Sequence, residues 1–270
     1  MKKRRPPIRM KKGVYILPNL FTTGNLFCGF WAIVAVHQED YFYAAAAILV
    51  ACVFDALDGK VARFSGSMSK FGIQYDSLAD LVSFGLAPAF LGFSWALRPY
   101  GRFGWLAAFL FVACGTLRLA RFNVMAAAGD TKYFKGLPIP AAASMIALII
   151  LLYQRLIETG GVKDVVILVM IYVLAFLMVS NIRYASFKEF DLAKRKPFSL
   201  FIFIVLTLVV VIMEPVIVLF AFMLTYTLSG PVNMLVGFRR RRLAKRAQIL
   251  GNQHAASTDE RAKPKQAEAD

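Results

Sequence analysis

The chain has few of the residues from which disulfide scaffolds, zinc sites and histidine-based active sites are built. Its 270 residues include only three cysteines, all inside apolar runs and without a CxxC spacing. A disulfide or zinc framework is therefore not expected. The two histidines, His37 and His254, lie far apart, which argues against a histidine-based metal site or catalytic triad. Acidic residues are also scarce, at 16 against 32 lysines and arginines.

The composition is that of a membrane protein. Hydrophobic residues make up 59% of the chain and the mean hydropathy is +0.59, whereas soluble domains are about 45–50% apolar. In a soluble protein, the net charge of +16 would suggest a nucleic-acid partner. Here the basic residues gather in short patches beside long apolar runs. That pattern is typical of membrane topology, so no nucleic-acid partner is expected.

Eight apolar runs are long enough to cross a bilayer of about 30 Å as helices. They lie at 17–36, 41–61, 75–97, 102–124, 137–154, 163–181, 198–213 and 215–236. The first follows a basic head but has no convincing cleavage site, so it is interpreted as a retained span. Only Glu214 and Pro215 separate the last two, which form either a hairpin or one broken segment. The predicted fold is an all-α, polytopic membrane helix bundle.

The basic residues also predict the orientation of the bundle. With the N-terminus inside, 28 of the 32 lysines and arginines fall on the cytoplasmic side. This asymmetry follows the positive-inside rule and supports an even number of spans. We expect both termini in the cytoplasm and the chain in the inner (cytoplasmic) membrane. The expected parts are a basic interfacial segment at 1–14, a transmembrane domain at 15–237, and a basic, then disordered tail at 238–270.

Four aspartates interrupt this apolar background: Asp55, Asp58, Asp76 and Asp80. The first two close the second span and the other two open the third, at the cytoplasmic side. Spacings of three and four residues put each pair on one helix face, and antiparallel neighbours can bring all four together. An aspartate at the centre of a membrane helix costs about 2.5–3.5 kcal/mol, so the group needs compensation.

Bound divalent metal would provide that compensation, because Lys60 and Arg63 are too few for four carboxylates. Oxygen-only ligands favour Mg²⁺ or Mn²⁺ over zinc. Two such ions at a cytoplasmic-side cavity suggest phosphoryl-group chemistry. Gly59 and Gly72 would let a ligand approach the backbone closely. The alternative is that the aspartates form buried interhelical ion pairs with Arg118, Arg121 or Arg183.

The chain resembles the CDP-alcohol phosphotransferases at eight positions of fixed spacing: Asp55-xx-Asp58-Gly59-xx-Ala62-Arg63-x8-Gly72-xxx-Asp76-xxx-Asp80. The resemblance implies a homodimeric membrane enzyme that displaces CMP from a CDP-linked donor with an alcohol. It implies Asp55, Asp58 and Asp76 as metal ligands, with Asp80 as a further ligand and the base for the acceptor hydroxyl. It also implies a cytidine diphosphate site formed by Gly59, Ala62, Arg63, Gly72 and Asn25.

Shorter stretches are similar to the bacterial phosphatidylserine synthases of that family. They lie at 17–22, 24–26, 118–123 and 136–140, with a weaker one at 183–188, so the resemblance covers roughly residues 15–190. It implies CDP-diacylglycerol and L-serine as substrates within a lipid bilayer. Pro138 and Pro140 belong to one of these stretches, and they either contact substrate or only shape the start of the fifth span.

Charge on the fourth span suggests an acceptor site. Serine presents a carboxylate, which arginine binds well, and Arg118 and Arg121 lie three residues apart near the cytoplasmic interface. Asn123 would take the ammonium group. The arginines would equally suit an inositol phosphate or glycerol phosphate acceptor. They could also simply extend to lipid headgroups.

The predicted function is transfer of the phosphatidyl group of CDP-diacylglycerol to L-serine, which gives phosphatidylserine and CMP. The nearest alternative is the same chemistry with glycerol 3-phosphate, inositol phosphate or choline as acceptor. An alternative of another class is a divalent-cation transporter. A carrier site is expected near the membrane midplane at broken helices, whereas these aspartates gather at one membrane face.

Overall fold

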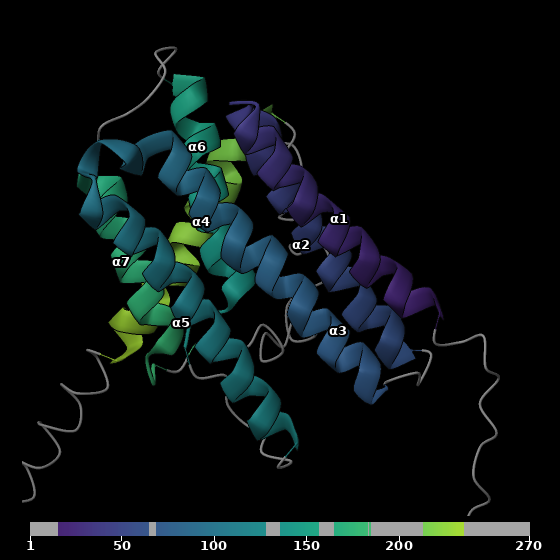
Figure 1. The fold of residues 1–270 in the computed structure, drawn as a ribbon. Coiled ribbons are helices and arrows are strands. Elements are labelled where there is room, and N and C mark those ends of the chain that lie inside the picture. Colours follow the sequence, from purple (N-terminus) through teal and green to yellow (C-terminus); the bar gives the residue numbers. More distant parts are fainter. Residues whose placement is uncertain are drawn as a thin grey trace, which may run out of the picture.

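The computed structural model describes residues 16–64, 69–127, 136–156, 165–182, 184 and 213–234. These residues form helices without any strand (Figure 1). Six helices are long and apolar enough to cross a membrane: Leu17–His37, Tyr41–Phe64, Phe71–Tyr100, Arg102–Met125, Ile139–Leu156 and Pro215–Met234. The shorter apolar helix Val165–Val179 accompanies them. The described residues are helical and include several candidate membrane spans, as predicted for an all-α polytopic bundle. The expected span at 198–213 lies outside them.

The first two helices form an antiparallel hairpin, α1 (Ile16–His37) and α2 (Tyr41–Phe64) (Figure 1). Its tight turn contains Glu39, whose φ is 64°. Small residues let the two helices pack closely, as is common between membrane helices. Ala32, Ala35, Ala44 and Ala45 are all fully or almost fully buried. The hairpin therefore fixes the end of α2, where Asp55 and Asp58 lie, against the start of α1.

The third helical segment begins at Lys70, five residues before the expected start at 75. Ser69 caps its N-terminus, and its hydroxyl accepts a hydrogen bond from the Gly72 amide at 2.9 Å. The segment runs as α3 (Lys70–Asp80), η1 (Leu81–Leu86), α4 (Ala87–Gly92), η2 (Phe93–Leu97) and η3 (Arg98–Tyr100). Its π-helical turn η1 starts directly after Asp80. Such turns inside helices often mark functional sites.

The remaining labelled helices are α5 (Arg102–Ala127), α6 (Ile139–Leu156) and α7 (Val165–Val179). Every residue from Ala141 to Leu151 of α6 is buried, because α2, α4, η1 and α7 surround this helix. A helix that is apolar on all sides belongs in such a core. α6 is thus the centre around which the other helices hold the aspartates at one end of the bundle.

The last helix of the described residues, Pro215–Met234, contacts the rest of the bundle at its start and in its second half. At the start, Arg155 pairs with Glu214 at 2.7 Å. In the second half, the Tyr184 hydroxyl donates to the Thr227 carbonyl at 3.2 Å. Burial, and to a lesser extent Tyr226, raises the pKa of Tyr184 to about 12, so the hydroxyl remains a protonated donor.

Gly136 fixes the entry into α6 and cannot be replaced without strain. Its φ is 85°, its amide donates to the Ile182 carbonyl at 2.9 Å, and the Leu137 amide donates to the Leu177 carbonyl at 3.0 Å. An added Cβ would lie 3.1 Å from the Met178 carbonyl carbon. This geometry gives the 136–140 stretch a structural role at the end of α7.

Gly136→Ala is expected to destabilise the protein by more than the roughly 1–3 kcal/mol of backbone strain alone, because the methyl group also meets the backbone of α7. Gly101→Ala is the matched control, since Gly101 also has a positive φ (53°) but no neighbour within 4 Å. Thermal unfolding in detergent measures both variants. Equal losses of stability in the two would show that the contact with α7 contributes nothing.

Candidate active site

Three carboxylates from two helices meet at one end of the bundle. Asp55 of α2 and Asp76 and Asp80 of α3 each offer an oxygen, and these oxygens all lie within 4.8 Å of one another. Asp58, one turn after Asp55, is 5% exposed and lies beside this cluster on the wall of a cavity. The structure therefore brings together the four aspartates that the sequence singled out.

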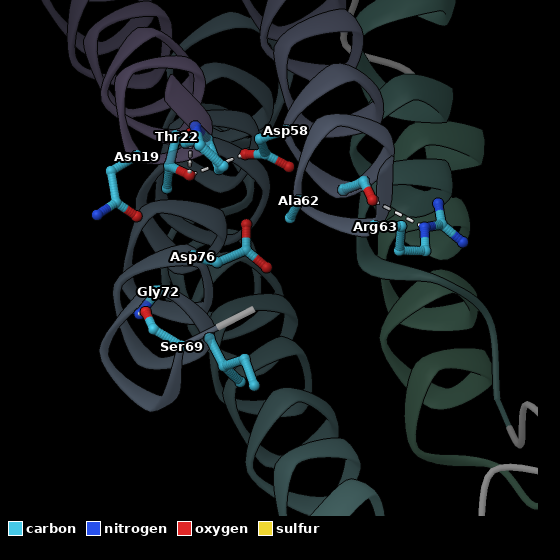
Figure 2. Close-up of a pocket in the computed structure, with 11 residues that line it drawn as sticks. Asn19, Thr22, Asp58, Ala62, Arg63, Ser69, Gly72 and Asp76 are labelled. Carbon is cyan, nitrogen blue, oxygen red and sulfur yellow. Dashed lines mark hydrogen bonds between the residues drawn. The ribbon is translucent and has the colours of Figure 1, made fainter. Parts of the chain in front are cut away.

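The cavity has a volume of about 280 Å³. Asp58 and Asp76 face it from α2 and α3 (Figure 2). Its lining includes four residues expected at the cytidine diphosphate site: Gly59, Ala62, Arg63 and Gly72. A Cβ on Gly72 would lie 3.1 Å from Ser69 Oγ and 3.4 Å from Asn19 Oδ1, so a side chain there would crowd the capping hydroxyl of Ser69. Arg63 turns back to donate from Nε to the Gly59 carbonyl at 2.7 Å.

Helix α1 supplies a third wall of the cavity, formed by residues to which the sequence analysis gave no role. Pro18, Asn19 and Thr22 line the cavity together with Ser69 and Ile73 (Figure 2). The signal was present, because Pro18, Asn19 and Thr22 belong to the 17–22 stretch. Nothing in that stretch indicated which aspartate it would face.

Asn25 occupies a different position from the expected one. It is fully buried and is not among the residues that line the cavity. Its Nδ2 donates to Asp80 Oδ1 at 3.0 Å. Three residues earlier, the Thr22 hydroxyl reaches Asp58 Oδ2 at 3.0 Å. Each end of the aspartate group is thus held by a side chain of α1.

The alternative of buried ion pairs is not supported by the described part of the chain. Its one ion pair is Arg155–Glu214, remote from the aspartates. Asp76 Oδ1 is buried without a hydrogen-bond partner, which is costly for a carboxylate. Clustered carboxylate oxygens with an unsatisfied member form a donor set that suits a hard divalent cation. Arg183 lies outside the described residues.

The structure separates the three residues expected at the acceptor site. Arg118 lies close enough to Asp80 and Tyr226 to interact electrostatically with both, and its Nε is buried without a hydrogen-bond partner. Arg121 instead donates to the Val179 carbonyl and to Asn181 Oδ1 at the end of α7. Asn123 pairs with Ser77 of α3, with its Nδ2 3.0 Å from the Ser77 hydroxyl. Of the three, Arg118 is the one with an electrostatic link to the aspartate cluster.

Comparison with known proteins agrees with the signature. The sequence profile described as CDP-alcohol phosphatidyltransferase matches residues 15–179. A CDP-diacylglycerol–serine O-phosphatidyltransferase of Helicobacter pylori is 37% identical over 222 residues, which cover 82% of this chain and 92% of the relative. The enzyme of that name in Bacillus subtilis is 34% identical over 173 residues, covering 64% of this chain and 92% of the relative.

A third relative, the archaetidylserine synthase of Methanothermobacter thermautotrophicus, is 38% identical over 170 residues, covering 62% of this chain and 69% of the relative. The profile covers more than half of the chain and includes all four aspartates. The chain belongs to the CDP-alcohol phosphatidyltransferase family.

Proposed function

We propose that this protein transfers the phosphatidyl group of CDP-diacylglycerol to the hydroxyl of L-serine, giving phosphatidylserine and CMP. The observation that carries the proposal is the cavity lined by Asp58 and Asp76, beside the cluster of Asp55, Asp76 and Asp80. Six of the eight signature residues line this cavity, and three similar proteins bear the names of serine-dependent lipid synthases. The membrane helices would keep the acyl chains of the donor in lipid while its headgroup enters the cavity.

Members of this family generally use divalent metal ions, and the carboxylates fit that requirement. Asp55, Asp58, Asp76 and Asp80 would hold two Mg²⁺ or Mn²⁺ ions. When bound, such ions neutralise phosphate charge and stabilise the attacking and leaving oxygens of a phosphoryl transfer. The chain itself supplies the buried carboxylates, of which Asp58 is 5% and Asp80 8% exposed.

The donor half of the site would hold the cytidine diphosphate. Gly59 and Ala62 leave room along α2, and Gly72 leaves room at the start of α3. Arg63 stands at the same wall as the cationic residue for a phosphate. Asn19 contributes an amide from α1.

Asp80 would act as the general base in the transfer. Its carboxylate takes the proton of the serine hydroxyl, and the serine oxygen forms a bond to the phosphorus that carries diacylglycerol. The bond between that phosphorus and the bridging oxygen breaks, and CMP leaves with the electron pair. A base positioned in this way typically accelerates a reaction by about 10²–10⁴-fold.

Arg118 would bind the serine carboxylate, since it interacts with Asp80 and its Nε is buried without a partner. Arg118→Ala is expected to raise the KM for serine by about 10–100-fold, as expected for the loss of a charge-assisted hydrogen bond, with little change in the KM for CDP-diacylglycerol. The serine KM of Arg118→Lys should lie between those of the wild type and Arg118→Ala, because lysine keeps the charge but loses the bidentate geometry.

Initial-rate kinetics in mixed micelles measure both KM values. Arg102→Ala is the control, because Arg102 lies at the other end of α5 and is exposed. A serine KM in Arg118→Ala within about twofold of the wild-type value would remove Arg118 from the acceptor site.

A panel of acceptors tests the function itself. Purified protein with CDP-diacylglycerol is offered serine, glycerol 3-phosphate, inositol phosphate or choline, and the lipid products are identified by mass spectrometry. We expect phosphatidylserine to form from serine at a far higher rate than the product of any other acceptor. Faster product formation with glycerol 3-phosphate than with serine would show that the protein uses a different acceptor from the one proposed.

The wider arrangement extends the proposal to the whole chain. It would have eight spans with both termini in the cytoplasm, a basic segment at 1–14, a catalytic domain at 15–237 and a tail at 238–270. It would lie in the inner membrane, with the site facing the cytoplasm, as a homodimer. A reporter enzyme that is active only outside the cytoplasm can be fused to the tail. Activity of this fusion would contradict the proposed orientation. A monomeric mass in native mass spectrometry would contradict the dimer.

A further inference from the structure

One face of α1 contacts two of the four aspartates: Asp58 on the cavity wall and Asp80 in the carboxylate cluster. Thr22 and Asn25 lie three residues apart and therefore share that face. The Thr22 hydroxyl lies 3.0 Å from Asp58 Oδ2 and 3.2 Å from the Pro18 carbonyl. It has one proton, and the carboxylate is the closer and stronger acceptor. Figure 2 shows this link from α1 to α2.

The second contact reaches Asp80. Asn25 Nδ2 donates to Asp80 Oδ1 at 3.0 Å, and Asn25 is completely buried. Its Oδ1 has no partner among the described residues. An unsatisfied buried acceptor is costly, and an apolar side chain would avoid that cost. Unlike an apolar side chain, however, the Asn25 amide donates a hydrogen bond to Asp80.

Asn25 is itself held by the turn that follows Asp80. The Ser83 hydroxyl in η1 donates to the Asn25 main-chain carbonyl at 2.9 Å, and Ser83 is fully buried. This approach requires Gly29, because a Cβ there would lie 2.6 Å from Ser83 Cα. Asp80 and Ser83 are thus tied to one residue, the first through its side chain and the second through its backbone.

We propose that Asn25 is a positioning residue that holds Asp80 in the orientation in which it takes the proton of the acceptor hydroxyl. The amide fixes Oδ1, which leaves Oδ2 to receive the proton. The inference rests on the proposed function, because it assigns Asn25 to the base and not to the cytidine diphosphate site. It predicts that changes at Asn25 act on turnover and leave donor binding intact.

Two substitutions separate the donor hydrogen bond from packing. Asn25→Asp keeps the shape but loses the amide donor, and Asn25→Ala also removes the bulk. Both should lower kcat by about 10–100-fold, the scale on which a small misplacement of a catalytic group acts. The KM for CDP-diacylglycerol should stay within about twofold. Ser83→Ala, which loosens Asn25 without touching Asp80, should give a smaller fall in kcat with the same pattern.

Two further variants serve as comparisons. Thr22→Val removes the contact with Asp58 on the cavity wall, so its KM for the donor should rise. Thr116→Val is the matched control, because the Thr116 hydroxyl bonds only within its own helix, to the Val112 carbonyl. The thermal shift caused by CDP gives a second readout of donor binding that does not depend on turnover.

The kinetics are measured with the acceptor that the wild-type protein uses best. If that acceptor is not serine, the proposed function fails while the role of Asn25 is still tested. A kcat in both Asn25 variants within about twofold of wild type would overturn the inference. So would a rise in donor KM or a loss of the CDP shift that matches the fall in kcat, because either would place Asn25 in donor binding. If Asn25→Ala does not fold, Asn25→Asp and Ser83→Ala decide.

Discussion

Asp80→Asn is expected to abolish measurable phosphatidylserine formation, with a loss of about 10²–10⁴-fold or more. The amide has nearly the shape of the carboxylate but cannot take a proton from the acceptor hydroxyl. The substitution also removes one carboxylate from the cluster of Asp55, Asp76 and Asp80. The variant should still fold, since Asp80 is held among carboxylates that repel one another. Lipid product and CMP are quantified in the same purified sample.

Asp40→Asn controls for the chemical change itself. Asp40 lies in the turn between α1 and α2, exposed and at the far end of the hairpin from the cavity. It should keep wild-type activity. An Asp80→Asn protein that makes phosphatidylserine at more than about a tenth of the wild-type rate would show that another group takes the proton.

Removal of divalent metal is the second large effect. Dialysis against EDTA should eliminate activity, and Mg²⁺ or Mn²⁺ should restore it. Metal should also raise the unfolding temperature, because Asp55, Asp76 and Asp80 present oxygens within 4.8 Å of one another. A ligand at about 100 times its Kd stabilises the folded state by about 2.7 kcal/mol.

Asp55→Asn makes the metal prediction specific to the cluster, because it removes one carboxylate from it. This variant should lose most of the metal-dependent rise in unfolding temperature, while Asp40→Asn should retain it. If metal raised the unfolding temperature equally in the wild type, Asp55→Asn and Asp40→Asn, the ions would bind outside the aspartate cluster.

The aspartate group was predictable because its information is local. Spacings of three and four residues fix a helix face, and a short connection makes α2 and α3 neighbours. The apolar runs predicted most helices for the same reason. The start of the third was placed too late, at 75, because the capping role of Ser69 was not recognised. The spans that the structure describes agree with the membrane assignment.

The partners of the aspartates were not predictable, because they depend on how helices pack. Arg118 and Arg121 lie three apart, and the spacing alone put both at the acceptor. Packing directs Arg121 to the end of α7 and leaves Arg118 near Asp80. Asn25 was assigned to the donor, whereas the approach of Ser83 to Gly29 places it against Asp80. The π-helical turn that sets this register has no simple sequence pattern.

Membership of a transferase family also decides between the enzyme and the cation transporter considered from sequence. The clustered carboxylates lie near the end of α2 and the beginning of α3, beside a cavity that Asp58 and Asp76 line.

Serine labelled with ¹⁸O in its hydroxyl tests the central claim most directly. If the serine oxygen attacks the phosphorus that carries diacylglycerol, mass spectrometry will find the label in phosphatidylserine and none in CMP, with the two products formed in equal amounts. Label in CMP, loss of label from the lipid, or CMP released without phosphatidylserine would contradict direct displacement by serine at this site.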